Sequence, residues 1–138
     1  MNYVKDVRGL KMMLVEQLKD DLQKRKRAFW DWHNANPQVY EKFEEYTLEA
    51  IATGRKHYSH WAIINRIRWN REIETNGGEF KISNDYICFY ARTFIAYNPQ
   101  HKDFFKLKPL KEEKLIRELE SSLEDRHVSF LPQLRNEG

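Results

Sequence analysis

Apolar residues recur at every third or fourth position along most of the chain, the spacing that places them on one side of an α-helix. The first such segment runs from Asp6 to Arg27, and the last from Lys111 to about Asp125. Their stripes consist of Leu10, Leu14, Leu18 and Leu22, and of Leu115, Leu119 and Leu123. Because each helix has a single apolar stripe, we expect the two to pack on each other or to pair across a homodimer.

Three further helices are predicted between these two, over residues 36–54, 59–71 and 83–97. Each begins at a residue whose side chain can cap a helix, namely Asn36, Ser59 and Ser83. Pro37 fits a first helical turn, while Gly54 and Pro99 favour termination. Before them, Phe29, Trp30 and Trp32 cannot share one side of a helix, so residues 28–33 are expected to form a packed connection.

A minor β element is predicted around the third of these helices. The Asn76-Gly77-Gly78 turn is followed by Phe80-Lys81-Ile82, which alternates apolar and polar side chains as a strand does. Lys106-Leu107-Lys108 is a candidate second strand opposite it. The predicted fold class is therefore mainly α: a five-helix compact domain with a minor two-stranded β element and a winged-helix-like centre.

Length and composition favour one domain with a sizeable core, since the chain has 138 residues, of which 41% are hydrophobic and 14% aromatic. We expect a single domain over residues 1–138, with an amphipathic helix over 1–28, a core over 36–109, a C-terminal helix over 110–126 and an irregular tail over 127–138. No apolar run approaches the roughly 20 residues that span a bilayer. The chain begins without the apolar core of a secretion signal, and Cys88 is its one cysteine, so a cytoplasmic protein is expected.

The sequence offers little catalytic chemistry. His57 and His60 are separated by the expected cap at Ser59, so they do not form a metal-binding pair on one helix. Glu79-Phe80-Lys81 matches half of a nuclease motif, but a strand carrying the second acid is missing from the pattern. We therefore predict a non-enzymatic protein with no metal and no cofactor, and leave open whether this tripeptide is a nuclease remnant or a chance match.

The charge distribution favours nucleic-acid binding. Residues 59–109 carry eight Lys/Arg and five Asp/Glu, whereas residues 110–138 carry five and seven. A helix followed by a short hairpin is the order in which winged-helix modules contact DNA, so duplex DNA is the expected partner. The candidate contact residues are Arg66, Arg68, Arg71, Lys81, Arg92, Lys102, Lys106 and Lys108. The Lys24-Arg25-Lys26-Arg27 run is interpreted instead as a solvated helix face.

The centre of the chain also resembles a family. Asn84, the Tyr90-Ala91-Arg92 triplet, Pro99 and the Phe104-Phe105 pair resemble small uncharacterised proteins encoded by phages and prophages. The resemblance implies no reaction and no catalytic residues, but it implies phage biology and a host-cell cytoplasm. The alternative function is therefore a protein-binding inhibitor or adaptor that acts on a host or anti-phage defence protein, as anti-CRISPR proteins do. The high aromatic content suits such an interface.

Overall fold

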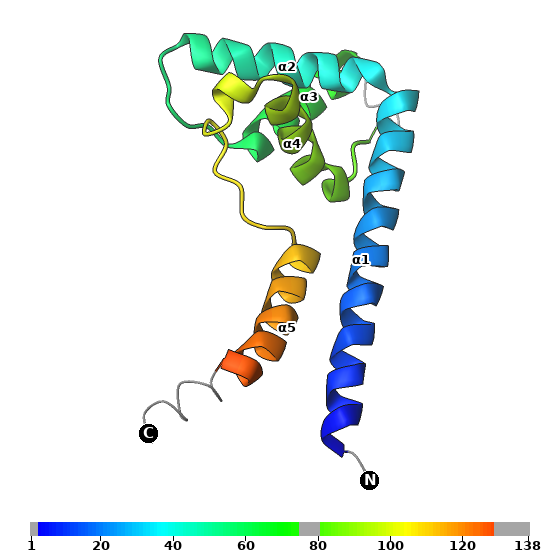
Figure 1. Ribbon diagram of the computed structural model, residues 1–138. Coiled ribbons are helices and arrows are strands. Elements are labelled where there is room, and N and C mark those ends of the chain that lie inside the picture. The colour runs from blue at the N-terminus through cyan, green and yellow to red at the C-terminus, as the bar shows by residue number, and fades with distance from the viewer. Residues whose placement is uncertain (1–2, 75–80, 129–138) are drawn as a thin grey trace. The chain divides into compact units, whose positions relative to one another are not determined.

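The computed structural model describes residues 3–74 and 81–128, and these form five α-helices and two short 3₁₀ helices (Figure 1). The α-helices are α1 (Tyr3–Ala35), α2 (Pro37–Ala52), α3 (His60–Glu74), α4 (Ile87–Tyr97) and α5 (Lys111–Val128). The 3₁₀ helices are η1 (Asn84–Tyr86) and η2 (Pro99–His101). The mainly helical prediction is confirmed. The chain divides into two compact units. One is Arg25–Lys108, and the other combines the segments that precede and follow it in the sequence.

The predicted β element is not found in the described residues, and the winged-helix-like centre has no support. Lys81, Ile82 and residues 106–108 have no regular secondary structure, while Phe80 and the expected turn at 76–78 lie outside the described residues. Arginine side chains hydrogen-bond the carbonyl oxygens that a ladder would use: Arg68 donates to Ile82 O at 2.6 Å, and Arg92 donates to Lys108 O at 2.8 Å. The backbone at Ile82 and at Lys108 therefore belongs to loops, and each loop is held by an arginine side chain.

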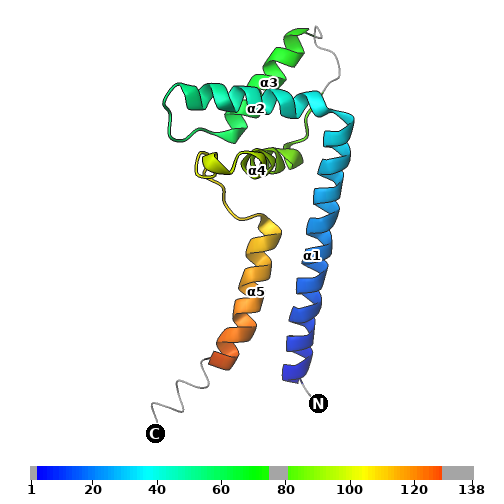
Figure 2. The same ribbon diagram turned by 45° about the horizontal axis from the view of Figure 1, so that its top comes forward.

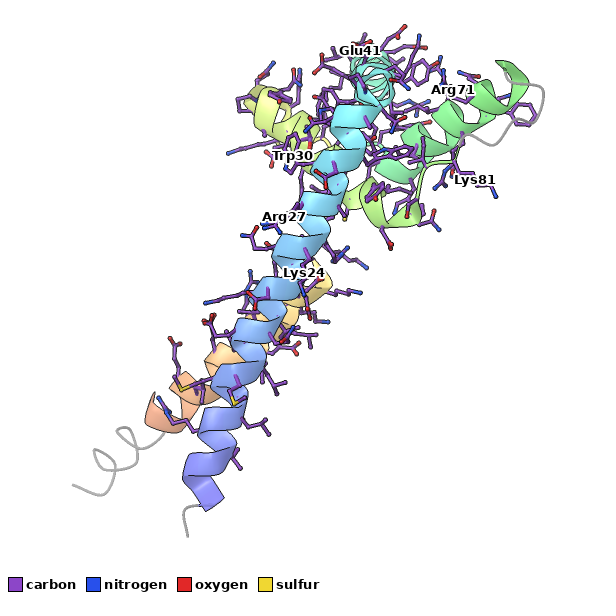
Figure 3. The ribbon with its side chains drawn as sticks, turned by 90° about the vertical axis from the view of Figure 1, so that its right-hand side faces the viewer. Lys24, Arg27, Trp30, Glu41, Arg71 and Lys81 are labelled. Atoms are coloured by element: carbon purple, nitrogen blue, oxygen red, sulfur yellow. The ribbon has the colours of Figure 1, made fainter. Side chains whose placement is uncertain are left out.

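Helix α1 is longer than predicted, because residues 28–33 continue the helix instead of connecting it to the next. Phe29 is buried and meets the Tyr90 ring edge-on, with 5.0 Å between ring centroids. Trp30, by contrast, is exposed and points away from the helix in Figure 3. Phe29, Trp30 and Trp32 do lie on different sides of the helix, as expected. The helix continues nevertheless, with the Trp30 side chain exposed to solvent.

The helix ends mostly follow the predicted signals. The backbone N–H of Ala62 donates to Ser59 Oγ, and that of Asp85 donates to Ser83 Oγ. Gly54 adopts a φ of +89°, a left-handed conformation that favours glycine after a helix. Asn36 differs: it precedes α2 without a side-chain capping bond, and its Nδ2 donates back to Trp32 O in α1.

The core of the Arg25–Lys108 unit is aromatic and lies where α2, α3 and α4 contact one another. Phe43 of α2 is fully buried, and its ring centroid lies 5.7 Å from those of Tyr90 and Phe105. Phe104 and Phe105 are both buried, so this pair inserts into the core. The core fixes the orientation of α3, whose outer side carries the candidate site.

The terminal unit contains α1 up to Lys24 together with α5. These segments lie side by side and run in opposite directions in both views (Figures 1 and 2). Lys11 Nζ donates to Ser122 Oγ at 2.6 Å, and Val15 and Leu22 are buried. The terminal helices therefore do lie together, one of the two arrangements expected. None of the described helices combines the length and the apolar character that crossing a membrane requires.

Candidate nucleic-acid interface

The inner side of α3 determines what its outer side presents. Ile63, Ile64 and Ile67 are buried against the aromatic core. Residues four apart on a helix lie on the same side, so Trp61, Asn65 and Trp69 form a line on the opposite side. Trp61 is 45% exposed and Trp69 is 63% exposed. We call Trp61, Asn65, Arg68 and Trp69 the outer face of α3.

Arg68 is fixed at the edge of this outer face. Its Nη2 donates to Ile82 O at 2.6 Å and to Asn84 Oδ1 at 2.7 Å, and its Nη1 donates to Asn65 Oδ1 at 3.2 Å. All three acceptors are uncharged. No carboxylate is among these three acceptors, and exposed Lys81 immediately precedes the bonded Ile82 (Figure 3).

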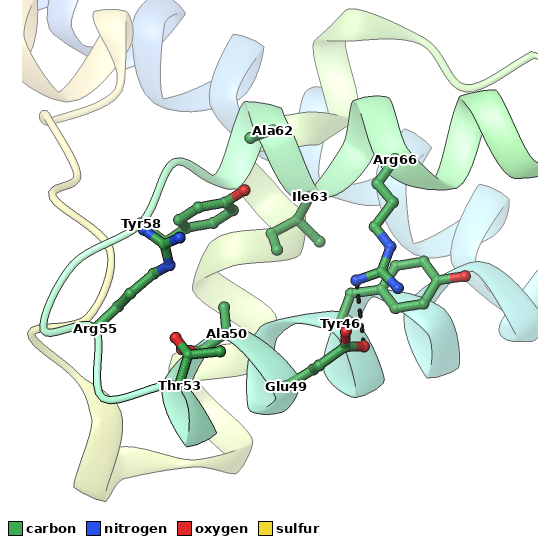
Figure 4. A pocket seen from close by; sticks show the side chains of 9 residues that line it. All are labelled: Tyr46, Glu49, Ala50, Thr53, Arg55, Tyr58, Ala62, Ile63 and Arg66. Atoms are coloured by element: carbon green, nitrogen blue, oxygen red, sulfur yellow. Dashed lines mark hydrogen bonds and ion pairs between the residues drawn. The ribbon is translucent and has the colours of Figure 1, made fainter.

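Arg66 lies beside the outer face but is differently bound. Its guanidinium carbon is 3.8 Å from the centroid of the Tyr46 ring, and its Nη1 is 3.2 Å from Glu49 Oε2. Figure 4 shows this group at one wall of a cavity of about 170 Å³ between α2 and α3. Arg55 over the Tyr58 ring forms the opposite wall (Figure 4). The carboxylate of Glu49 offsets the charge of Arg66, so Arg66 is a weaker candidate for contacting phosphate than Arg68.

Arg92 of α4 acts within the fold. Its Nη1 donates to Cys88 O at 3.0 Å and its Nη2 to Lys108 O at 2.8 Å. The bond to Lys108 fastens the loop that follows η2 to α4, whereas the bond to Cys88 lies within α4. Burial, and secondly the positive charge of Arg92, lower the pKa of His60. Arg92 is thus first a structural residue, although both of its acceptors are uncharged and its charge persists.

The remaining predicted contacts fall into two kinds. Arg71 is half-buried and lines a groove between α2 and α3 with Val39, Tyr46 and Ile67. The four lysines are all exposed: Lys81, Lys102, Lys106 and Lys108. Of the eight predicted cations, Arg68 and Lys81 lie near each other, because Arg68 is hydrogen-bonded to Ile82, the residue after Lys81. The structure places Arg92 at the loop that carries Lys106 and Lys108.

The basic run at the middle of α1 is not one continuous charged face. Arg25 is half-buried, with its guanidinium carbon 5.4 Å from the centroid of the Phe89 ring. Lys24 and Arg27 are exposed and point outward in Figure 3. The run therefore contributes one packed arginine, a half-buried Lys26 and two exposed cations, Lys24 and Arg27.

The predicted contact residues did not include Trp61, Asn65 and Trp69. The signal was present, because Trp61, Asn65 and Trp69 are spaced by four while the isoleucines of the same helix occupy the other side. Charge counting drew attention to arginines instead. Two of these, Arg68 and Arg92, turned out to hold the loops on which the predicted lysines sit.

The structure shows no constellation of metal ligands in residues 3–74 and 81–128, where no three His, Cys, Asp or Glu side chains gather. His57 Nδ1 lies 3.2 Å from Asp103 O, and the His60 ring lies against Phe105. Of the half nuclease motif, Glu79 and Phe80 lie outside the described residues. No family model matches the chain, and neither curated proteins nor solved structures give a match.

Proposed function

We propose that this protein is a non-enzymatic, phage-type accessory protein that binds nucleic acid, and that the outer face of α3 is its contact surface. The observation that carries the proposal is the pairing of two exposed indoles with a guanidinium that three uncharged acceptors hold in place on the same helix. Aromatic rings that stack on bases, beside cations that contact the backbone, are the usual components of single-strand binding.

Single-stranded nucleic acid fits this surface better than a duplex. The hairpin expected to touch duplex phosphates has no support among the described residues. Trp61 and Trp69 are eight residues apart, which is about 12 Å along a helix, so each would stack on a separate base. Lys81, beside the loop that Arg68 holds, would add a backbone contact.

The test is a titration of labelled single-stranded oligonucleotide, followed by fluorescence anisotropy at low and raised salt. Affinity should fall as salt rises, since bound phosphates release counterions. Trp61→Ala and Trp69→Ala should each weaken binding by roughly 5- to 150-fold, the range for loss of one stacked base. Tyr97→Ala is the matched control, because Tyr97 is 62% exposed, as Trp69 is, but lies on α4.

Two outcomes would overturn this proposal: no binding at low salt, or binding that both tryptophan variants retain. If the protein instead bound duplex more tightly than single strands, and the tryptophan variants bound as well as the unmodified protein, the lysines of residues 81–108 would be the better candidates for the contact surface.

The second candidate function is a protein-binding inhibitor or adaptor that acts on a host or defence protein. Tryptophan and arginine dominate the energetics of many protein interfaces, and the outer face of α3 offers both. The chain's net charge of only +3 suits this alternative as well. A stoichiometric host protein that is retained after nuclease treatment, and is lost with Trp61→Ala/Trp69→Ala but kept with Tyr97→Ala, would favour it.

A further inference from the structure

The terminal unit leaves much apolar surface in water. Within α1, Val15 and Leu22 are buried, but Leu10 is 56% exposed and Met13 is 70% exposed. Leu115 of α5 is 45% exposed. A groove of about 410 Å³ lies along both helices and is lined by Leu14, Leu18, Leu115, Glu118 and Leu119. Two helices alone do not cover this surface.

The apolar stripe predicted for α1 is only partly buried: Leu22 is covered, whereas Leu10 and Leu14 are exposed and belong to a second, exposed stripe. Leu10, Met13 and Leu14 are spaced by three and four, so they lie together on one side of the helix. This side is adjacent to the stripe of Val15 and Leu22, which is buried. A helix with two neighbouring apolar stripes is the pattern of a helix in a four-helix bundle, where each helix packs against two neighbours. Here α5 supplies only one neighbour.

The charges of α1 and α5 favour a second copy of this chain as the additional neighbour. Over residues 7–24, α1 carries four basic and three acidic side chains, whereas residues 111–124 of α5 carry three basic and five acidic ones. Two copies related by a two-fold axis would place the more basic α1 of each against the acidic α5 of the other. Acids on both helices make an anionic membrane surface a poor match.

We propose that a second copy of this chain covers the groove, so that α1 and α5 of two copies form an antiparallel four-helix bundle. Eighteen helical residues are about 27 Å long and two adjacent helices about 20 Å wide. Such a face covers about 540 Å² in projection, the same order as the ~800 Å² of accessible surface that each partner contributes to a stable interface. The bundle would bury Leu10, Leu14 and Leu115 in its centre.

Light scattering coupled to size exclusion, on the full chain at tens of micromolar and free of nucleic acid, tests the proposal. The expected mass is twice 16.8 kDa. Leu10→Glu should give a monomer, because it places a charge in the bundle core. Met12→Glu is the matched control: Met12 is 54% exposed, close to Leu10, but lies on the other side of α1. This variant should remain a dimer.

A monomeric unmodified chain at these concentrations would overturn the proposal, as would a dimer that Leu10→Glu leaves intact. Removal of residues 129–138 tests whether the C-terminal segment, instead of a second copy, occupies the groove. If the full chain is a monomer and only the shortened chain dimerises, the C-terminal segment and not a second copy covers the groove, and the proposal fails. Circular dichroism should show equal helix content for Leu10→Glu and Met12→Glu, so that a mass change reports assembly.

Discussion

Replacing Arg68 by methionine should destabilise the Arg25–Lys108 unit, although the sequence suggests a freely exposed phosphate contact. The side chain donates three hydrogen bonds, at 2.6, 2.7 and 3.2 Å, and the acceptors at Asn65 and Asn84 are exposed. Water can replace the arginine at those two amides. It cannot easily do so at the carbonyl of Ile82, which is buried.

The expected loss follows from that one carbonyl. A buried acceptor left without its partner costs about 1–3 kcal/mol, so Arg68→Met should lower the free energy of unfolding by about 2 kcal/mol. Arg68→Lys should cost nearly as much, because a single ammonium cannot reach three acceptors in a fork. Arg66→Met is the comparison, since its half-exposed pair with Glu49 is worth at most about 1 kcal/mol. Arg66 also lies over the Tyr46 ring, and methionine keeps an apolar contact with that ring.

Urea unfolding followed by tryptophan fluorescence measures these differences. All four tryptophans lie in the Arg25–Lys108 unit, so the signal reports on that unit. With a urea dependence of about 2 kcal/mol per molar, the Arg68→Met midpoint should shift down by about 1 M. A midpoint within about 0.2 M of the unmodified protein, or a shift smaller than that of Arg66→Met, would refute the reasoning.

Three further predictions concern the same unit. Tyr90→Phe removes the 2.7 Å bond from Trp32 Nε1 and should cost about 1 kcal/mol in urea unfolding. Burial raises the pKa of Tyr90 to about 12, so the free energy of unfolding should decline between pH 10 and 12, and decline less in Tyr90→Phe. Burial lowers the pKa of His33 and His60, so the urea midpoint should fall as pH drops below about 6.5; equal midpoints at pH 5 and pH 7 would contradict this. Gly54→Ala should cost about 1 kcal/mol from backbone strain alone, because no atom lies within 4 Å of the added methyl group.

Local signals in the sequence were enough to predict most of the helices. The cap at Ser59, the proline at position 37 and the glycine at position 54 act within one turn, so they can be read without knowing the fold. The continuation of α1 through Trp30 was missed because an exposed tryptophan has no local penalty in a helix. Only the tertiary packing of Phe29 shows that the helix must continue.

The β element failed for a different reason. An alternation of three residues becomes a strand only if a partner supplies backbone hydrogen bonds, and this depends on the whole fold. Arg68 and Arg92 satisfy the backbone of Ile82 and Lys108 instead. The candidate site was affected by the same long-range bonds, since the sequence gives the charge of an arginine but not the group to which it donates.

The distribution of tryptophans also supplies built-in spectroscopic probes. Trp32 is hydrogen-bonded to Tyr90 and stacks near Tyr86, whereas Trp61 and Trp69 are turned to solvent on α3. Acrylamide should therefore quench the emission of Trp61, Trp69 and the exposed Trp30 before that of Trp32. A ligand that covers α3 should shift the emission of Trp61 and Trp69 to shorter wavelength. Occupancy of α3 can thus be followed in the unlabelled protein, with the shielded indole as an internal reference.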